Sequence, residues 1–208
     1  MRLVLASHNA KKLQELSAML CGMGIDLVAQ GALGIAEAEE PHRTFIENAL
    51  AKARHAAATA QGPTIADDSG LCVDVLDGEP GVISAHYAGE VPAQGAREAQ
   101  RRQQDAANNA LLLQRLAGKT NRRAHFISTL VAVRHADDPQ PLVAVGRWAG
   151  EILTAPRGQH GFGYDPLMFI PELNCTVAEM DAALKNQHSH RSQAMGQMKV
   201  LLLEVWCL

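Results

Sequence analysis

A chain of 208 residues is long enough to form one large domain or two tightly joined lobes, and its 47% hydrophobic content is ordinary for a globular protein. A net charge of −3 argues against a protein that coats a nucleic acid polymer or lies on a membrane surface. No apolar run approaches the roughly 20 residues of a membrane span, and the run at residues 3–6 is too short for a signal peptide.

The four cysteines lie far apart and form no C-x-x-C pair. A structural zinc site needs cysteines and histidines at short ligand spacing, and His188 and His190 have no cysteine at such a spacing. We therefore predict reduced, mostly buried thiols in a cytoplasmic protein. The cysteines are Cys21, Cys72, Cys175 and Cys207.

The first elements are a short buried strand and an amphipathic helix. The apolar run at residues 3–6 predicts the strand, and apolar residues at helical spacing predict a helix over 11–23. Gly22 and Gly24 are typical of a helix end.

A second helix and a second strand follow. Thr44-Phe45-Ile46-Glu47 matches the capping box, and the alanine-rich run to Ala60 favours a helix. Gly62-Pro63 stops this helix, and residues 64–66 predict a strand that ends at two acids.

The second half of the chain predicts a polar helix and a hairpin. The helix covers residues 97–116 and is closed by Gly118. Alternating apolar residues predict a strand over 124–134, and residues 142–153 return as its partner.

The last part of the chain predicts a long loop followed by helices. Residues 156–166 hold three glycines and two prolines, which is typical of a loop. A second capping box at residues 176–179 opens a helix, and Ser189 caps the last helix. Because strands and helices do not alternate strictly, the pattern favours an α/β or α+β fold with a mixed sheet. The residues of the last helix expected to face inward are Met195, Met198, Leu201, Leu202 and Val205.

The most informative motif is Ile65-Ala66-Asp67-Asp68-Ser69-Gly70. Adjacent acids repel each other and gain nothing from packing, but they suit a divalent cation that faces a phosphate. Asp67 and Asp68 either both serve a magnesium ion, or one activates a water while the other binds the metal. The alternative is an acidic surface turn.

A second acidic pair, Glu39-Glu40, precedes the second helix. A carboxylate there would complete an oxygen-rich shell around a cation, whereas the alternative is a solvated loop. Glu47 carries less weight as a ligand because it is the acid of the capping box.

Two basic segments are candidates for phosphate binding. Residues 7–12, Ser-His-Asn-Ala-Lys-Lys, join the first strand to a helix N-terminus, where free backbone N–H groups attract anions. The alternative is an N-cap with two solvated lysines. Lys185, His190 and Arg191 form the second segment and would donate hydrogen bonds to purine carbonyls or phosphate oxygens, unless they are a solvated basic patch.

The loop Gly161-Phe162-Gly163-Tyr164-Asp165-Pro166 places two rings between glycines in a chain with only 4% aromatic residues. A base stacks on such a ring, and glycine allows backbone to approach a ligand closely. We also expect the backbone of residues 162–165 to donate hydrogen bonds to a purine. The alternative is that the rings anchor the loop to the core.

Five motifs in this order resemble the Ham1/RdgB family of inosine triphosphate pyrophosphatases: S-H-N-A-K-K, F-I-E-N-A-L-A-K-A, I-A-D-D-S-G-L, G-F-G-Y-D-P and K-N-Q-H-S-H-R. The match runs from the first strand to the last helix. The resemblance implies a single domain over residues 1–208 with an elongated central mixed β-sheet flanked by helices and two lobes around a nucleotide-binding cleft. It also implies a homodimer and Mg²⁺-dependent hydrolysis of ITP, dITP and XTP to the monophosphate and pyrophosphate.

The resemblance also assigns roles to residues. Asp68 matches the general base and metal-linked acid, and the upstream metal acid is either Glu39 or Glu40. The family's first motif often reads T-G-N, and here Ser7-His8-Asn9 replaces the glycine with histidine. The residues that match substrate contacts are Ser7, His8, Asn9, Ala10, Lys11, Lys12, Ser69, Phe162, Gly163, Tyr164, Asp165, Lys185, His190 and Arg191.

Two other functions remain open at this point. One is a pyrophosphatase for a different aberrant nucleotide, such as a modified pyrimidine, and the other is a nucleotide sensor without turnover. A sensor has no need for a water-activating carboxylate beside the phosphates. A haloacid-dehalogenase-type phosphatase is disfavoured because Asp67-Asp68-Ser69-Gly70 lacks the D-x-D spacing.

Overall fold

The computed structural model describes residues 1–90, 92 and 96–207, with the side chain of Arg97 left out. Within these residues the chain forms two compact units. Unit 1 comprises residues 1–69, 128–147 and 188–207, and unit 2 comprises residues 70–127 and 148–187.

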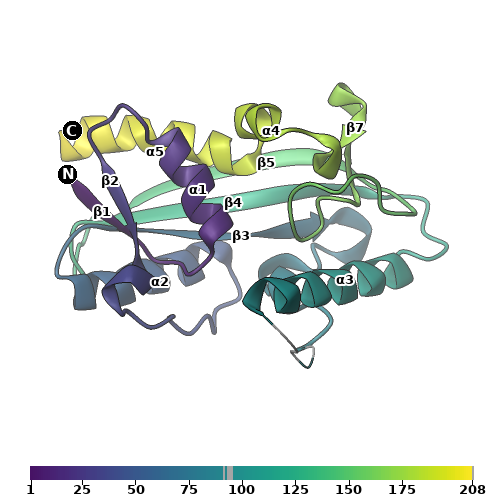
Figure 1. Cartoon of the computed structure of the whole chain (residues 1–208), viewed down its shortest axis with the longest axis horizontal. Helices are drawn as coiled ribbons and strands as arrows, with labels where there is room; N and C mark the ends of the chain where they lie inside the picture. The colour runs from purple at the N-terminus through teal and green to yellow at the C-terminus, as the bar shows by residue number, and fades with distance from the viewer. Residues whose placement is uncertain (91, 93–95, 208) are drawn as a thin grey trace. The chain divides into compact units, whose positions relative to one another are not determined.

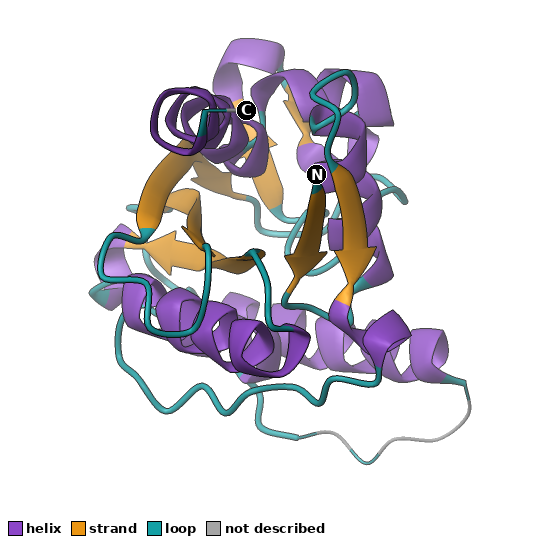
Figure 2. Ribbon diagram, turned by 90° about the vertical axis from the view of Figure 1, so that its left-hand side faces the viewer, coloured by secondary structure: helices purple, strands orange, loops and turns teal. Residues whose placement is uncertain are grey.

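One seven-stranded sheet runs in the order β2-β1-β3-β4-β5-β6-β7. β1 pairs in parallel with β2 and β3, whereas β6 pairs antiparallel with β5 and β7. The sheet is therefore mixed and flanked by helices (Figure 2), which confirms the predicted fold class. The strands are β1 Arg2–Leu5, β2 Asp26–Ala29, β3 Thr64–Val73, β4 Arg123–Val133, β5 Leu142–Ile152, β6 Met168–Ile170 and β7 Cys175–Thr176.

The α-helices agree largely with the sequence expectations. Thr44 and Ser189 cap α2 and α5 by accepting hydrogen bonds from backbone N–H groups, as predicted. α1 ends four residues earlier than expected, because Gly22 and Gly24 adopt positive φ, which no α-helix continues through. The helices are α1 Ala10–Met19, α2 Phe45–Ala60, α3 Arg97–Arg115, α4 Ala182–His188 and α5 His190–Trp206.

Short 3₁₀ helices fill several connections, and one of them modifies a prediction. The capping box at Thr176 and Glu179 is present, but it opens a single 3₁₀ turn, and the α-helix begins only at Ala182. The loop over residues 156–166 is confirmed. The 3₁₀ helices are η1 Gln30–Leu33, η2 Asp74–Leu76, η3 Gly81–His86, η4 Pro171–Leu173 and η5 Val177–Glu179.

Unit 1 buries apolar side chains on both faces of its strands, and alternation along the strands decides which face each side chain joins. Leu5 and Ile65 lie in a cluster with side chains of α1 and α5, whereas Ala66 lies in a second cluster with Ala49 and Ala53 of α2. Figure 1 accordingly shows α1 and α5 on one side of these strands and α2 on the other. The strands of unit 1 thus present alternate residues to two different helical layers.

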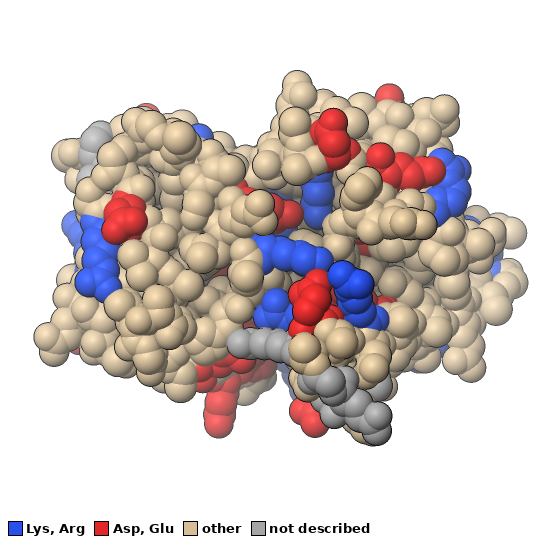
Figure 3. Space-filling model, in the orientation of Figure 1, with Lys and Arg blue, Asp and Glu red and all other residues tan. Residues whose placement is uncertain are grey.

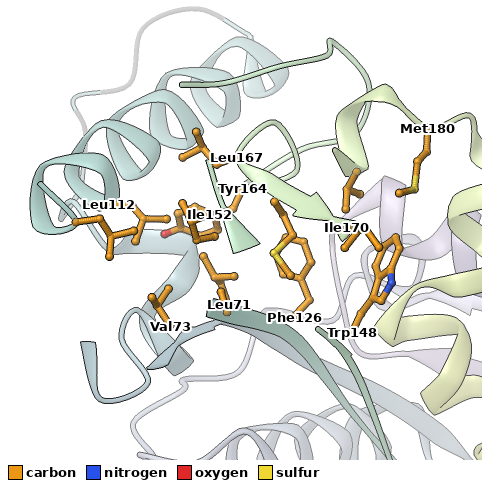
Figure 4. Close-up of a cluster of buried hydrophobic side chains, with 14 residues drawn as sticks. Leu71, Val73, Leu112, Phe126, Trp148, Ile152, Tyr164, Leu167, Ile170 and Met180 are labelled. Atoms are coloured by element: carbon orange, nitrogen blue, oxygen red, sulfur yellow. The ribbon is translucent and has the colours of Figure 1, made fainter. Parts of the chain in front are cut away.

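Unit 2 has its own core, built mainly from aromatic and aliphatic side chains. Phe126 and Trp148 belong to one buried cluster with Tyr164 and Ile170, and Figure 4 shows this cluster extending from Trp148 and Ile170 at one end to Leu112 of α3 at the other. Tyr164, one of the two rings of the glycine-rich loop, is therefore an anchor of this core.

Two sequence expectations need correction. The acids Asp67 and Asp68 lie inside β3, which continues to Val73, and not beyond the end of a strand. A strand tolerates two buried acids here because each carboxylate is paired with cationic side chains. The thiols are free, but the prediction that they are mostly buried is wrong, because Cys21 and Cys207 are exposed and Cys72 and Cys175 are only half-buried. No described helix is long and apolar enough to cross a bilayer.

Two glycines of unit 1 give a matched test of how closely α5 packs on β5. A Cβ added at Gly146 would overlap the backbone of His190 and Ala194, whereas a Cβ at Gly196 on α5 itself would meet nothing. We expect Gly146→Ala to lower the free energy of unfolding by about 1–3 kcal/mol through overpacking. Gly196→Ala should raise it by about 0.5–1 kcal/mol through helix propensity.

Urea unfolding of both variants measures these two changes in free energy. A Gly146→Ala variant as stable as the unaltered protein would show that α5 does not rest against the backbone of β5.

Candidate active site

Asp67 is the centre of a buried ionic network in unit 1. Its Oδ1 accepts a hydrogen bond from Ser128 at 2.7 Å, and its Oδ2 contacts Arg191 Nε at 3.0 Å and Lys12 Nζ at 2.9 Å. Burial alone would raise the pKa of Asp67, but Lys12 and Arg191 outweigh it and hold that pKa well below the usual range. Asp67 is therefore an ionised anchor whose two oxygens are both engaged.

Arg191, at the start of α5, is one of the most deeply buried side chains of the protein, with 2% of its surface exposed. Besides Asp67 it contacts Glu15 of α1 at 2.6 Å and the Ser69 hydroxyl at 3.0 Å. The network thus holds two cations and two carboxylates, and α1, β3 and α5 each contribute to it. The predicted substrate contacts of Ser69 and Arg191 stay predictions, because both side chains are engaged with each other and with Asp67.

Asp68 points to the opposite face of β3, toward α2, because neighbouring strand residues alternate. Its Oδ1 contacts Lys52 Nζ at 2.7 Å. Its Oδ2 is buried and has no hydrogen-bond partner among the described residues. Burial raises the pKa of Asp68 to about 6, and the nearby Glu40 carboxylate adds to the rise against the opposing effect of Lys52.

Lys52 is a site residue that the sequence did not reveal. Its ammonium bridges Asp68 and Glu40 at 2.7 and 2.9 Å. Burial would lower the pKa of Lys52, but these two carboxylates raise it. A lysine at helical spacing from the buried Ala49 and Ala56 was the available signal, since a cation on the inner face of a helix needs a buried anion.

The segment of residues 7–12 has a mixed outcome. Asn9 is the N-cap of α1 and accepts from the N–H groups of Lys11 and Lys12, and Ser7 accepts from the N–H of Asn9. Lys12 is not solvated, because its side chain is 15% exposed and paired with Asp67. Whether these residues hold a triphosphate stays a prediction.

His8 ties this segment to residues 31–37. Its Nδ1 lies 2.9 Å from a Glu37 carboxylate oxygen, and its Nε2 lies 3.1 Å from the carbonyl oxygen of Ile35. A Cβ at Gly31 would overlap the His8 ring, so the ring lies directly on that glycine. His8 therefore fills a specific contact with residues 31–37.

A divalent cation has oxygen donors available on the α2 face of β3. Asp68 Oδ2 is buried without a partner among the described residues, and Glu40 pairs with the same lysine as Asp68. Glu39 and Glu40 are both exposed, so the contact with Lys52 is what sets Glu40 apart. Within the residues that the structure describes, no three His, Cys, Asp or Glu side chains form a group that would hold a metal ion. The carboxylates thus fit a hard cation that takes its remaining ligands from phosphates and water.

Unit 2 holds the second set of predicted substrate residues. Asp165 Oδ2 accepts hydrogen bonds from Lys185 Nζ at 2.8 Å and from the N–H of Phe162 at 2.9 Å. Lys185 Nζ also lies 4.7 Å from the centre of the Phe162 ring. Asp165 and Lys185 are both buried, so this ion pair fastens the loop to α4.

Side chains of α3 also hold the loop, and the sequence did not predict this contact. The N–H of Gly163 donates to Asp105 Oδ2 at 2.8 Å, and its carbonyl oxygen accepts from Asn109 Nδ2 at 2.9 Å. Because the N–H groups of Phe162, Gly163 and Asp165 all have acceptors within unit 2, they are not open donors for a purine as expected. These α3 contacts span more than 50 residues of sequence, and no local pattern signals them.

The predicted site residues therefore fall into two sets, one in each unit. In unit 1 lie Ser7, His8, Asn9, Ala10, Lys11, Lys12, Glu39, Glu40, Asp68, Ser69, His190 and Arg191, and in unit 2 lie Phe162, Gly163, Tyr164, Asp165 and Lys185.

Figure 3 shows basic and acidic side chains interspersed on the face that it draws, in keeping with local charge pairs.

Comparisons with known proteins agree with the sequence resemblance. The model of the Ham1 family matches residues 3–201. A protein of Leptothrix cholodnii named dITP/XTP pyrophosphatase is 65% identical, with 100% of both chains covered. One of the same name from Methylibium petroleiphilum is 66% identical over 99% of each chain. The solved structure of a HAM1 protein from Coxiella burnetii superposes with a TM-score of 0.88 at 39% identity, covering 99% of this chain and 100% of that one. This chain belongs to the Ham1 family.

Proposed function

We propose that this protein hydrolyses the non-canonical purine nucleoside triphosphates ITP, dITP and XTP to the nucleoside monophosphate and pyrophosphate, and so removes aberrant purines from the nucleotide pool. The full-length relatives named dITP/XTP pyrophosphatase support the reaction. The observation that carries it is Asp68, a buried carboxylate with one oxygen on Lys52 and the other without a partner.

The chemistry proposed for Asp68 follows from its environment. A carboxylate whose pKa is raised to about 6 is still ionised at neutral pH and is a stronger base than an ordinary aspartate. Asp68 accepts a proton from a water molecule while the oxygen of that water forms a bond to the α-phosphorus. The bond from the α-phosphorus to the bridging oxygen breaks, and its electron pair leaves with pyrophosphate. Lys52 orients the carboxylate through Oδ1, which directs the unpartnered Oδ2 to the water.

The cofactor proposed is Mg²⁺, which Asp68 and Glu40 would hold and which neutralises charge on the triphosphate when bound. Asp67 holds the ammonium of Lys12 in place at 2.9 Å. Lys12 lies near enough to Asp68 and Glu40 to lower the pKa of both, so it would neutralise charge on the same triphosphate. Asp67 itself binds no metal in this scheme, because its oxygens are already shared among Ser128, Lys12 and Arg191.

The proposal is tested by hydrolysis of ITP, dITP, XTP, ATP, GTP and a modified pyrimidine triphosphate, with release of pyrophosphate measured. We expect kcat/KM for the three non-canonical purines to exceed that for ATP and GTP by more than about tenfold, or ~1.4 kcal/mol. The side chains proposed as donors to the 6-carbonyl of hypoxanthine or xanthine are those of Lys185, His190 and Arg191. With adenine, such a donor would meet an amino group and stay unpaired. Guanine, which shares that carbonyl, is excluded through its 2-amino group.

The same measurements decide between the alternatives. Turnover should stop when EDTA removes divalent cations and return when Mg²⁺ is added. A preference for the pyrimidine would favour a different aberrant nucleotide as substrate. Tight binding without release of pyrophosphate would favour a nucleotide sensor, and full activity after exhaustive chelation would contradict the metal-dependent mechanism.

The assembly proposed is a homodimer in the cytoplasm, where nucleoside triphosphates are used. Symmetric dimers are the commonest oligomers of soluble proteins. Light scattering at micromolar concentration should therefore give about twice the monomer mass of 22.3 kDa. A mass equal to one chain throughout the micromolar range would show that the protein acts as a monomer.

A further inference from the structure

We propose that Asp105 and Asn109 of α3 are positioning residues for base selectivity, which they exert by holding the loop of residues 161–165 in one conformation. This inference rests on the proposed function, in which that loop binds the purine. Neither Asp105 nor Asn109 is among the residues proposed to contact the nucleotide. They act through the backbone of Gly163.

The first step is the geometry of the two contacts. The Gly163 N–H belongs to the peptide group shared with Phe162, and the Gly163 carbonyl belongs to the peptide group shared with Tyr164. Asp105 accepts from the first at 2.8 Å, and Asn109 donates to the second at 2.9 Å. Both peptide planes that hinge on the Gly163 Cα are therefore held by side chains one helical turn apart.

The second step is the flexibility that these contacts remove. Gly161 and Gly163 have φ values of +78° and +62°, in the left-handed region that glycine enters without steric cost. A glycine between two rings would let the ring of Phe162 move relative to the anchored Tyr164. With both peptide planes held, the direction of the Phe162 ring is set.

The third step is the free-energy cost of burying the Asn109 amide oxygen without a hydrogen bond. Its Oδ1 is buried and has no hydrogen-bond partner among the described residues. A leucine of similar shape would occupy the same space without leaving a buried acceptor unpaired. The contact that makes an amide useful at this position is thus its donor to the Gly163 carbonyl.

The fourth step links position to selectivity. An enzyme discriminates between purines through polar groups that form hydrogen bonds with one base and not with another. This discrimination falls when the bound base moves far enough to weaken those hydrogen bonds. Phe162 and Lys185 are in contact, and Asp165 holds both, so a loop that moves at Gly163 also moves the Lys185 ammonium. Selectivity should therefore be more sensitive to Asp105 and Asn109 than the turnover of the preferred substrate is.

The experiment measures kcat/KM for ITP, XTP and ATP in four variants, together with thermal unfolding. Asn109→Leu and Asp105→Ala should each lower the ITP-to-ATP ratio of kcat/KM by at least about tenfold. Asp105→Asn keeps an acceptor for the Gly163 N–H and should restore most of the ratio. Gln103→Ala, on an exposed position of the same helix, should leave the ratio unchanged.

The outcomes separate this inference from the proposed function. If the unaltered protein does not prefer ITP or XTP to ATP, the proposed function fails before any variant is read. If it does, and Asn109→Leu folds as stably as the unaltered protein with a lowered ratio, the positioning role is supported. An equal loss of kcat/KM for all three nucleotides, with the ratio unchanged in both Asn109→Leu and Asp105→Ala, would overturn it.

Discussion

Replacing Asp68 with asparagine is expected to lower kcat by at least about 100-fold, the lower range for loss of a general base. The amide has nearly the same shape as the carboxylate and still accepts from Lys52 through its oxygen, so the fold should be retained. Circular dichroism and thermal unfolding check this. Asp74→Asn is the matched control, because Asp74 follows the same strand but is exposed and should tolerate the change. Turnover of Asp68→Asn near that of the unaltered protein at saturating Mg²⁺ would remove Asp68 from the mechanism.

The pH dependence of kcat/KM gives an independent measure of the same role. Because Asp68 acts as a base only when ionised, activity should rise with pH through the pKa of this carboxyl, which burial raises to about 6 in the metal-free protein and which a bound cation would lower. The stability effect has the opposite sign. Between the ordinary aspartate pKa near 4 and about 6, the folded protein holds a proton that the unfolded chain releases, so this group makes folding less favourable as pH rises. The acidic limb of the rate profile should be absent in Asp68→Asn, and its persistence would assign the limb to another group.

Sequence reasoning was most successful where the interactions are local. The caps at Thr44 and Ser189 and the loop over residues 156–166 depend on neighbours within a few residues, and all three are confirmed. The predicted end of α1 was too late, because Gly22 and Gly24 adopt positive φ although the apolar pattern continues to residue 23. The strands β2, β6 and β7 were not predicted, because two to four residues are too few to show an alternating pattern. β1 is equally short and was predicted only from its unbroken apolar run.

The candidate site could be predicted from the sequence only in part, for a different reason. The adjacent acids were recognised, but treating them as one acidic pair hid the alternation of β3, which sends Asp67 toward α1 and α5 and Asp68 toward α2. Lys52 was concealed in an alanine-rich helix. Asp105 and Asn109 act on a residue more than 50 positions away, and pairing over such a distance leaves no trace in local sequence.

Replacing Asp67 with asparagine is expected to lower the free energy of unfolding by about 3–5 kcal/mol, the range for breaking a buried ion pair by removing one partner. The cluster of Lys12, Arg191, Asp67 and Glu15 is neutral as it stands, with two cations and two carboxylates. The substitution leaves a net positive charge beside Arg191, which is 2% exposed and does not release its proton. Asp137→Asn, an exposed acid in a turn of the same unit, should change stability by less than about 0.5 kcal/mol.

Acid weakens this contribution, with a sign that follows from the lowered pKa of Asp67. The stability it provides is complete above the unfolded aspartate pKa near 4 and is lost as pH falls toward the depressed folded value. The stability difference between the unaltered protein and Asp67→Asn should therefore shrink as the pH falls below about 4. Urea unfolding at pH 7 and at pH 3 measures the difference at both ends of this range.

A second substitution separates loss of charge balance from loss of shape. Adding Lys12→Met to Asp67→Asn restores neutrality, because Arg191 keeps Glu15 at 2.6 Å and no unpaired cation faces residue 67. The double variant should therefore be less destabilised than the sum of the two single variants, with a coupling between about 0.5 and 3 kcal/mol. Lys12→Met alone should be costly, since it leaves Asp67 with one cation fewer. Strict additivity of the two changes would mean that Lys12 and Asp67 contribute independently, and that the neutral cluster is not what makes these buried charges stable.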